Sequence, residues 1–208
     1  MELLLSGRIR EKAPGGKAMD ALEAIMTRHM VGRVRPERPR REEIETLLRA
    51  AVRAPNHRLT EPWRFVVIAG KARDELGEVF AQILRATKPE ATEEELNRER
   101  AKPHRAPVII AVGCLKGRDP IETHENIVAA AAAIQNILLA AHAMGLGAYL
   151  RTGDTAYHPL LLRWLGLPED AQFMGFIYLG YPAPDAPPRQ TPRRPIEEVT
   201  EWRGWTPD

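Results

Sequence analysis

The sequence predicts an α+β fold in which helices cover both faces of a mixed central β-sheet. Segments rich in β-branched and aromatic residues alternate along the chain with stretches whose apolar residues recur every three to four positions. Such alternation places helices on the faces of a sheet. The chain has 208 residues, 44% of them hydrophobic, which is enough for one compact domain with a buried core.

Four segments are predicted to be strands, and they cover residues 64–69, 108–114, 148–151 and 173–179. The first (RFVVIA) follows a proline and ends at Gly70, as strands commonly do. The second (VIIAVGC) is almost wholly apolar, so we expect it to be buried on both faces of the sheet.

Helical periodicity predicts helices over residues 19–27, 42–52, 71–86, 124–144 and 159–165. The charged segment 89–102 is expected to form a polar helix or a lid. The tail after Tyr181 is rich in proline and is expected to be extended. Its last piece, IEEVTEW at 196–202, is a candidate for pairing with a sheet edge.

The segment 127–150 is the most apolar part of the chain and is about long enough to cross a bilayer. It carries Gln135, Asn136 and His142, which would be costly in lipid, whereas a helix in a protein core can pair them. We therefore expect a core helix of a cytoplasmic protein. The five consecutive alanines at 129–133 allow a second helix to approach closely, which favours a homodimer over purely intramolecular packing.

Scarce residues and missing motifs exclude several kinds of site. Cys114 is the only cysteine, so the chain forms no internal disulfide, and its apolar surroundings favour a core residue over a nucleophile. Ser6 is the only serine, which argues against a serine hydrolase. The glycine fingerprint of dinucleotide-binding domains is missing, and the histidines lack the spacing of metal ligands. A net charge of +2 argues against nucleic-acid binding.

Arginine is unusually frequent, with 24 arginines against 6 lysines. Three clusters of arginine and neighbouring polar residues, at 28–33, 53–58 and 150–153, follow predicted helices or strands. A guanidinium group can bind a phosphate through two parallel hydrogen bonds. A helix or strand that precedes the arginine can fix the direction of its side chain. Each cluster alone is equally compatible with a surface loop. Together they make an anionic ligand the leading hypothesis.

In their order along the chain, the motifs RHM at 28–30, RAPNH at 53–57 and GLGAYLRTG at 145–153 resemble those of the nitroreductase family. The resemblance is strongest to its short, single-domain, FMN-dependent NAD(P)H nitroreductase branch. It describes residues 19–208 as one domain, with flavin mononucleotide (FMN) at the interface of a homodimer. Residues 1–18 lie outside it, and we expect a mobile N-terminal arm or a true start at Met19.

The resemblance also implies which residues bind FMN: Arg28, His29, Met30, Arg53, His57, Leu150, Arg151 and Thr152. The cluster at 28–30 is expected to hold the phosphate and ribityl side, and the residues at 150–152 to complete that anchor. Arg53 and His57 are expected to reach the cofactor from the partner subunit. Near the flavin ring, Arg53 or Arg33 would favour the negatively charged reduced state.

Three positions depart from the family pattern, which often has serine, asparagine and glutamine where this chain has Met30, Leu59 and Glu61. At Met30 only the backbone N–H can replace the contact that a serine hydroxyl makes. Trp63, Trp164 and the segment 87–102 are candidates for shaping the pocket of the electron acceptor.

The expected function is to pass a hydride from NAD(P)H, by way of FMN, to an electron-poor acceptor such as a nitroaromatic or a quinone. The two substrates would bind in turn, in a ping-pong mechanism. Because the flavin carries the chemistry, no catalytic protein residue and no metal are expected. The alternatives are a flavin-assisted dehydrogenase or dehalogenase of a specific metabolite, a non-catalytic dimeric flavin-binding protein, and an interaction module without a cofactor.

Overall fold

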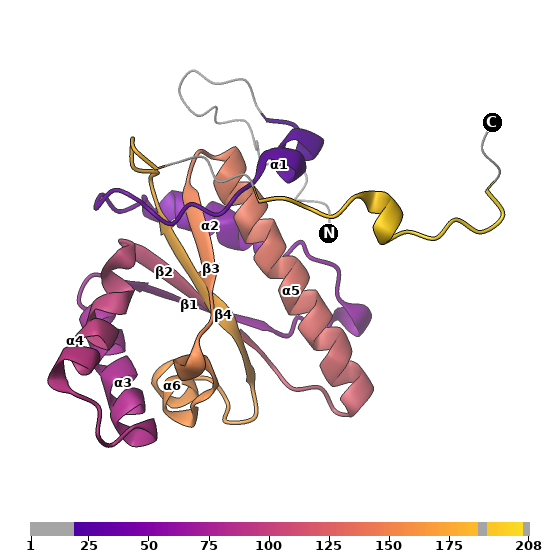
Figure 1. Cartoon of the computed structure of the whole chain (residues 1–208). Coiled ribbons are helices and arrows are strands. Elements are labelled where there is room, and N and C mark those ends of the chain that lie inside the picture. Colours follow the sequence, from indigo (N-terminus) through magenta and orange to yellow (C-terminus); the bar gives the residue numbers. More distant parts are fainter. Residues whose placement is uncertain (1–18, 187–190, 206–208) are drawn as a thin grey trace, which may run out of the picture.

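The computed structural model describes residues 19–186 and 191–205, so the arm expected at residues 1–18 lies outside the described residues. The described strands form one sheet in the order β1-β2-β4-β3 (Figure 1). They are Trp63–Ala69 (β1), Val108–Cys114 (β2), Gly147–Arg151 (β3) and Gln172–Gly180 (β4). The α+β class is confirmed, and the strand ends differ from the predicted ones by no more than one residue.

The sheet is antiparallel at each described pairing, which corrects the expectation of a mixed sheet. The cause is the connection after β1. Two helices, α3 (Ala72–Thr87) and α4 (Glu93–Ala101), pack against each other and return the chain to the edge where β1 ended. Ala69, the last residue of β1, is therefore the partner of Val108, the first residue of β2.

The other described α-helices are α1 (Ala21–Thr27), α2 (Arg41–Ala51), α5 (Pro120–Ala143) and α6 (Pro159–Trp164). Short 3₁₀ helices that the sequence did not predict lie at His57–Leu59, Lys102–Arg105, Asp154–Tyr157 and Ile196–Glu198. The last of these begins the segment 196–202 that was a candidate for pairing with a sheet edge, and no residue of that segment is in a strand. Beyond it, the tail up to residue 205 extends away from the sheet past α5 (Figure 1).

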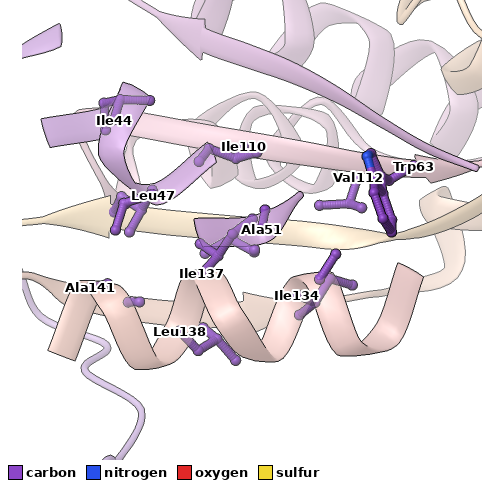
Figure 2. Packing of buried hydrophobic residues seen from close by; sticks show 14 of the residues in the cluster. Ile44, Leu47, Ala51, Trp63, Ile110, Val112, Ile134, Ile137, Leu138 and Ala141 are labelled. Atoms are coloured by element: carbon purple, nitrogen blue, oxygen red, sulfur yellow. The ribbon is translucent and has the colours of Figure 1, made fainter. Parts of the chain in front are cut away.

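One face of the sheet is covered by α5 and α2 (Figure 2). Ile110 and Val112 of β2 point into this layer, where Leu47 of α2 and Ile137 of α5 are fully buried. The opposite face is covered by α3 and α6, which pack on Ile109 of β2 and on the aromatic residues of β4. The central strand β2 is buried throughout its length, as its apolar sequence predicted.

Helix α5 begins at Pro120, four residues before the predicted start. Asp119 caps it, because its carboxylate accepts a hydrogen bond from the Glu122 backbone N–H at 2.8 Å. Proline is also well suited to the first helical position. The apolar periodicity becomes clear only after the first turn, which is why it predicted a later start.

Length and composition would allow α5 to cross a membrane, and 44% of its most apolar window is buried inside the protein. Two of its polar residues have hydrogen-bond partners inside the protein, as expected for a core helix. The Asn136 amide donates to the carbonyl of Ala50 in α2 at 3.1 Å, and His142 is hydrogen-bonded to Thr27. The exposed part of the helix includes Ile121 and Val128.

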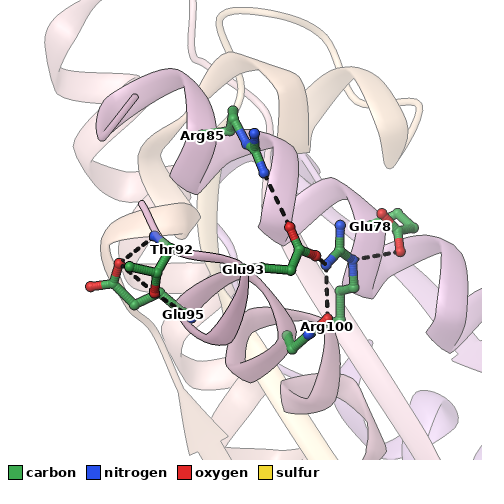
Figure 3. A network of polar contacts seen from close by, with 7 residues as sticks. Glu78, Arg85, Thr92, Glu93, Glu95 and Arg100 are labelled. Atoms are coloured by element: carbon green, nitrogen blue, oxygen red, sulfur yellow. Dashed lines mark hydrogen bonds and ion pairs between the residues drawn. The ribbon is translucent and has the colours of Figure 1, made fainter. Parts of the chain in front are cut away.

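Helix α4 forms where the sequence predicted a polar helix, and its ion pairs tie it to α3 (Figure 3). Arg100 of α4 contacts Glu78 of α3 at 2.8 Å and Glu93 of its own helix at 2.6 Å, while Arg85 of α3 lies 3.4 Å from Glu93. The one buried apolar residue of α4, Leu96, packs against α3. Most of this segment is therefore a solvated second layer outside α3.

Candidate functional site: an arginine cluster beside β3

The segment that follows α1 lies along β3, which is an edge strand. The Val31 backbone N–H donates to the carbonyl of Ala148 at 3.0 Å. Gly32 stands against the ring of Tyr149, where a Cβ atom would come within 3.4 Å of Tyr149 Cδ2. The cluster at 28–30 therefore lies next to the strand that ends at Arg151. The tertiary structure brings two of the three predicted clusters to the same edge of the sheet.

His29 is held against the C-terminal end of α5. Thr27 Oγ1 lies 2.8 Å from His142 Nε2, and His29 Nδ1 lies 3.2 Å from the carbonyl oxygen of Thr27. The rings of His29 and His142 meet edge to face, with centroids 5.8 Å apart. Burial is the largest cause that lowers the pKa of His142, and the proximity of His29 and Arg28 lowers it further. His142 is therefore neutral at physiological pH.

The Arg28 side chain keeps an unused hydrogen-bond donor. Its Nη1 atom is buried and has no hydrogen-bond partner among the described residues. Leaving a buried donor unsatisfied costs about 1–3 kcal/mol, and more for a charged group. An anionic oxygen at this position would remove that cost, which makes Arg28 suited to binding a phosphate.

The Arg151 side chain is positioned by the strand from which it comes. Its guanidinium carbon lies 4.3 Å from the centroid of the Tyr149 ring, a cation–π contact. The neighbouring strand β4 contributes through Gly175, which has a φ of +138°. A Cβ atom at this glycine would lie 2.9 Å from Leu150 Cδ1 and 3.1 Å from the Arg151 carbonyl oxygen. Gly175 thus allows the end of β3 to lie close to β4.

The remaining residues of these two clusters have different surroundings. Met30 and Leu150 are half-buried and pack against the core layer formed with α5, so their backbones are more accessible to a ligand than their side chains. Thr152 is exposed directly after β3. Arg33, which the sequence suggested as a cation near the flavin, forms an ion pair with Asp185 at 2.6 Å.

Arg53 and His57 are not brought to this cluster within one chain. They lie between α2 and β1 and are exposed, and the 3₁₀ helix that begins at His57 contacts α5. Its Arg58 acts electrostatically on Glu122, in the first turn of α5, whereas Arg28 and His29 act on His142 in the last turn. The twenty residues between the two ends correspond to about 30 Å of helix.

The segment around His57 has an unusual backbone. Arg58 and Leu59 have φ values of 52°, and Glu61 has a φ of 42°. The Asn56 side chain stabilises this turn by accepting a hydrogen bond from the Glu61 backbone N–H at 3.0 Å. Non-glycine residues in this region are strained, and such strain clusters at ligand-binding segments. The turn leaves Leu59 81% exposed.

The structure does not place the candidate acceptor-pocket residues at this cluster. Trp63 is buried in the core beneath α5, Trp164 packs on the opposite face of the sheet, and most of the segment 87–102 lies outside α3. Sequence reasoning also assigned no role in the site to His142, Tyr149 and Gly175, although Tyr149 lies inside the motif at 145–153. Of these three residues, only Gly175 could have been found from the sequence, because a glycine inside an apolar strand often marks irregular strand pairing.

A thiol nucleophile is excluded by the surroundings of Cys114. The residue is 1% exposed, and burial raises the pKa of its thiol to about 11. The protonated thiol is therefore the form present at neutral pH, in agreement with the prediction of a core residue.

Comparison with known proteins identifies the family. The model of the "Nitroreductase family" matches residues 25–181. The Escherichia coli K12 protein named "Putative NAD(P)H nitroreductase YdjA" is 32% identical over 165 residues, which cover 79% of this chain and 89% of that protein.

Two solved structures are similar over most of their length. A nitroreductase-like family protein from Bacillus cereus aligns with a TM-score of 0.77 at 25% identity, covering 91% of this chain and 99% of that one. A "putative nitroreductase in complex with fmn" from Desulfovibrio desulfuricans aligns with a TM-score of 0.66 at 29% identity, covering 89% and 97%. The sequence motifs, the fold and these likenesses agree, and the chain belongs to the nitroreductase family.

Proposed function

We propose that this protein is an FMN-dependent oxidoreductase that passes a hydride from NAD(P)H to an electron-poor acceptor, such as a nitroaromatic or a quinone, in a ping-pong mechanism. The observation that carries the proposal is the buried Nη1 of Arg28, which has no hydrogen-bond partner within residues 19–186 and 191–205. Arg28 stands on the segment lying along β3, the strand that ends at Arg151. The relatives named as NAD(P)H nitroreductases and the similar structure in complex with FMN support it.

In this proposal Arg28 and Arg151 hold the FMN phosphate, with charge-assisted hydrogen bonds from their guanidinium groups. Tyr149 keeps the Arg151 side chain in place, and Met30 and Leu150 offer backbone groups to the ribityl chain. When bound, FMN supplies the ability to accept a hydride from NAD(P)H and to donate it to the acceptor. No side chain is assigned the role of a catalytic acid or base.

Arg53 and His57 enter this site from the partner subunit of a homodimer. Their position near the opposite end of α5 from Arg28 supports such an arrangement, because one chain alone cannot bring the two groups together. Apolar side chains are available for the interface: Met26 of α1 is 83% exposed, Val128 of α5 is 56% exposed, and Trp202 and Trp205 of the tail are 64% and 72% exposed. Side chains of this size and character are typical of interface cores.

The same observations support a cytoplasmic protein, because α5 packs in the core and its Asn136 and His142 have hydrogen-bond partners inside the protein. We propose that these exposed apolar side chains meet a second copy of the chain and not a membrane.

The first experiment tests the redox role on the purified protein. We expect it to carry flavin absorbance at a mass of two chains, and anaerobic NADH or NADPH to bleach that absorbance. Flavin that is bound but reduced no faster than free FMN would indicate a binding protein instead. A protein that takes up no FMN would overturn the proposal.

The second experiment tests the residues. Arg28→Gln removes the buried guanidinium, and we expect the Kd for FMN to rise roughly 10- to 100-fold, the loss of one charge-assisted contact. Arg163→Gln is the matched control, because Arg163 is an exposed arginine on α6 that pairs with Glu169. Equal FMN affinity in the two variants would show that Arg28 does not bind FMN.

A further inference from the structure

A second concentration of positive charge lies where α3 begins, outside the residues assigned to FMN. A cavity of about 220 Å³ opens there between the segment 34–36, the first turn of α3 and the residues leading into β2. Arg35, Arg73, His104 and Arg105 line it together with apolar residues, and none of the described residues that line it is acidic. Several water-sized groups fit in such a volume.

Arg73 is held in position inside this cavity and keeps a free donor. Its Nη1 donates to the carbonyl of Ala106 at 3.0 Å, which fixes the plane of the guanidinium group. Its Nε atom is buried and has no hydrogen-bond partner among the described residues. A buried, charged donor without an acceptor is the exception in folded proteins, and an anionic oxygen would satisfy it.

The position of Arg73 in its helix also favours an anion. Arg73 is the second residue of α3, a helix of 16 residues, and the residue preceding the helix, Lys71, makes no side-chain capping hydrogen bond. The first-turn backbone N–H groups already donate to the carbonyls of Gly70 and Lys71, so the arginine side chains would supply the hydrogen bonds to a ligand. The positive end of the helix dipole adds a favourable field for a bound anion.

Two acidic residues belong to the same turn, and neither forms an ion pair with Arg73 in the described part of the chain. Asp74 lies 3.1 Å from His104 at the rim of the cavity, and Glu75 is the other acidic residue of the first turn. Arg35 stacks on the ring of Tyr181, with 5.2 Å between its guanidinium carbon and the ring centroid. In the described part of the chain neither Arg35 nor Arg105 has a carboxylate within ion-pair distance.

We propose that this cavity binds a phosphate group, as inorganic phosphate or as the phosphate of a small monoester, independently of FMN. Arg73 would contribute its Nε donor, and Arg35 and Arg105 would close over the anion from the opposite walls. The residues that line it are not among those assigned to FMN, and the proposal does not depend on the proposed redox function.

The test uses FMN-loaded protein in phosphate-free buffer at constant ionic strength. Inorganic phosphate and glycerol phosphate are titrated separately, with ³¹P line width and calorimetry as readouts. We expect saturable binding of one phosphate per chain, and a Kd at least about tenfold higher in both Arg73→Gln and Arg105→Gln. Arg85→Gln is the matched control, because Arg85 lies on the same helix and faces Glu93 of α4. Its Kd for phosphate is expected to be unchanged.

The two titrations distinguish the two possible ligands. A lower Kd for glycerol phosphate than for inorganic phosphate assigns the site to phosphate monoesters, and an equal or higher Kd assigns it to the free ion. Binding that does not saturate, or that Arg85→Gln weakens as much as Arg105→Gln does, would overturn the proposal. A rise in the Kd for FMN in Arg105→Gln would also overturn it, since the cavity would then belong to the flavin site. The effect of Arg28→Gln on FMN binding tests the proposed function and does not bear on this phosphate site.

Discussion

The guanidinium group of Arg151 lies over the ring of Tyr149, two residues earlier on the same strand, with 4.3 Å between the guanidinium carbon and the ring centroid. Side chains two residues apart on a strand point to the same face, so β3 itself creates this contact. The ring also touches Gly32, on the segment that carries Arg28. Tyr149 is therefore the side chain that links the two arginine clusters.

This contact predicts a role for Tyr149 in FMN binding. Tyr149→Leu keeps an apolar side chain but removes the π face, and an exposed cation–π contact is worth about 0.5–1 kcal/mol. We expect a roughly two- to fivefold higher Kd for FMN, measured from the quenching of flavin fluorescence. Tyr157→Leu, at a 74% exposed tyrosine in the following 3₁₀ helix, is the control. Equal Kd values in the two variants would show that the ring does not position Arg151.

The backbone of Gly175 predicts a large effect of a single methyl group. Gly175→Ala combines a φ of +138° with a Cβ atom 3.1 Å from the Arg151 carbonyl oxygen, so β3 and β4 must separate locally. We expect the free energy of unfolding in urea to fall by about 3 kcal/mol. Gly166→Ala has a φ of +68° but open space around the new Cβ, and should lose only about 1–2 kcal/mol. A smaller loss at Gly175 than at Gly166 would contradict this interpretation of the strand pair.

The depressed pKa of His142 predicts how stability depends on pH in the FMN-free protein. Below pH about 6.5 the unfolded chain binds a proton at this residue, while the folded chain, in which burial disfavours the charged form, does not. Stability is therefore lost as the pH falls through the interval between the unfolded and the lower folded pKa.

The variant His142→Gln tests this linkage, because it removes the titrating group and keeps a side chain that can hydrogen-bond to Thr27. We expect its unfolding free energy to decrease less than that of the wild type between pH 7 and pH 5, measured in urea. Parallel pH profiles for the two proteins would show that His142 does not titrate abnormally.

The buried thiol of Cys114 predicts low chemical reactivity. Since its pKa is raised to about 11, the thiolate is scarce at pH 8 and also shielded from reagents. We expect no labelling by a disulfide reagent in the native state, and labelling of one thiol per chain after unfolding in urea. Rapid labelling of the native protein would mean that β2 opens far more readily than its complete burial indicates.

Local patterns in the amino-acid sequence were sufficient to predict the regular elements and the family. Apolar patterns located each strand to within one residue and every α-helix except α4 to within a few, because burial on one face or both is encoded locally. The charge of segment 89–102 indicated a polar helix or a lid, and most of the segment forms α4. The motifs at 28–30, 53–57 and 145–153 pointed to an anionic cofactor and to the family. The apolar run of β2 correctly indicated burial on both faces.

How these elements meet depends on contacts between segments far apart in the chain. The antiparallel sheet requires α3 and α4 to form a hairpin. The two helices meet through Arg100 and Leu96, and the periodicity of each segment alone does not encode the direction of the strand that follows. The contacts of His142 with His29, of Tyr149 with Gly32 and of Gly175 with the end of β3 join distant parts of the chain as well. Local pattern specifies which residues are buried or charged, whereas the surroundings of Arg28 Nη1, which is buried and has no partner among the described residues, are defined only by the packed structure.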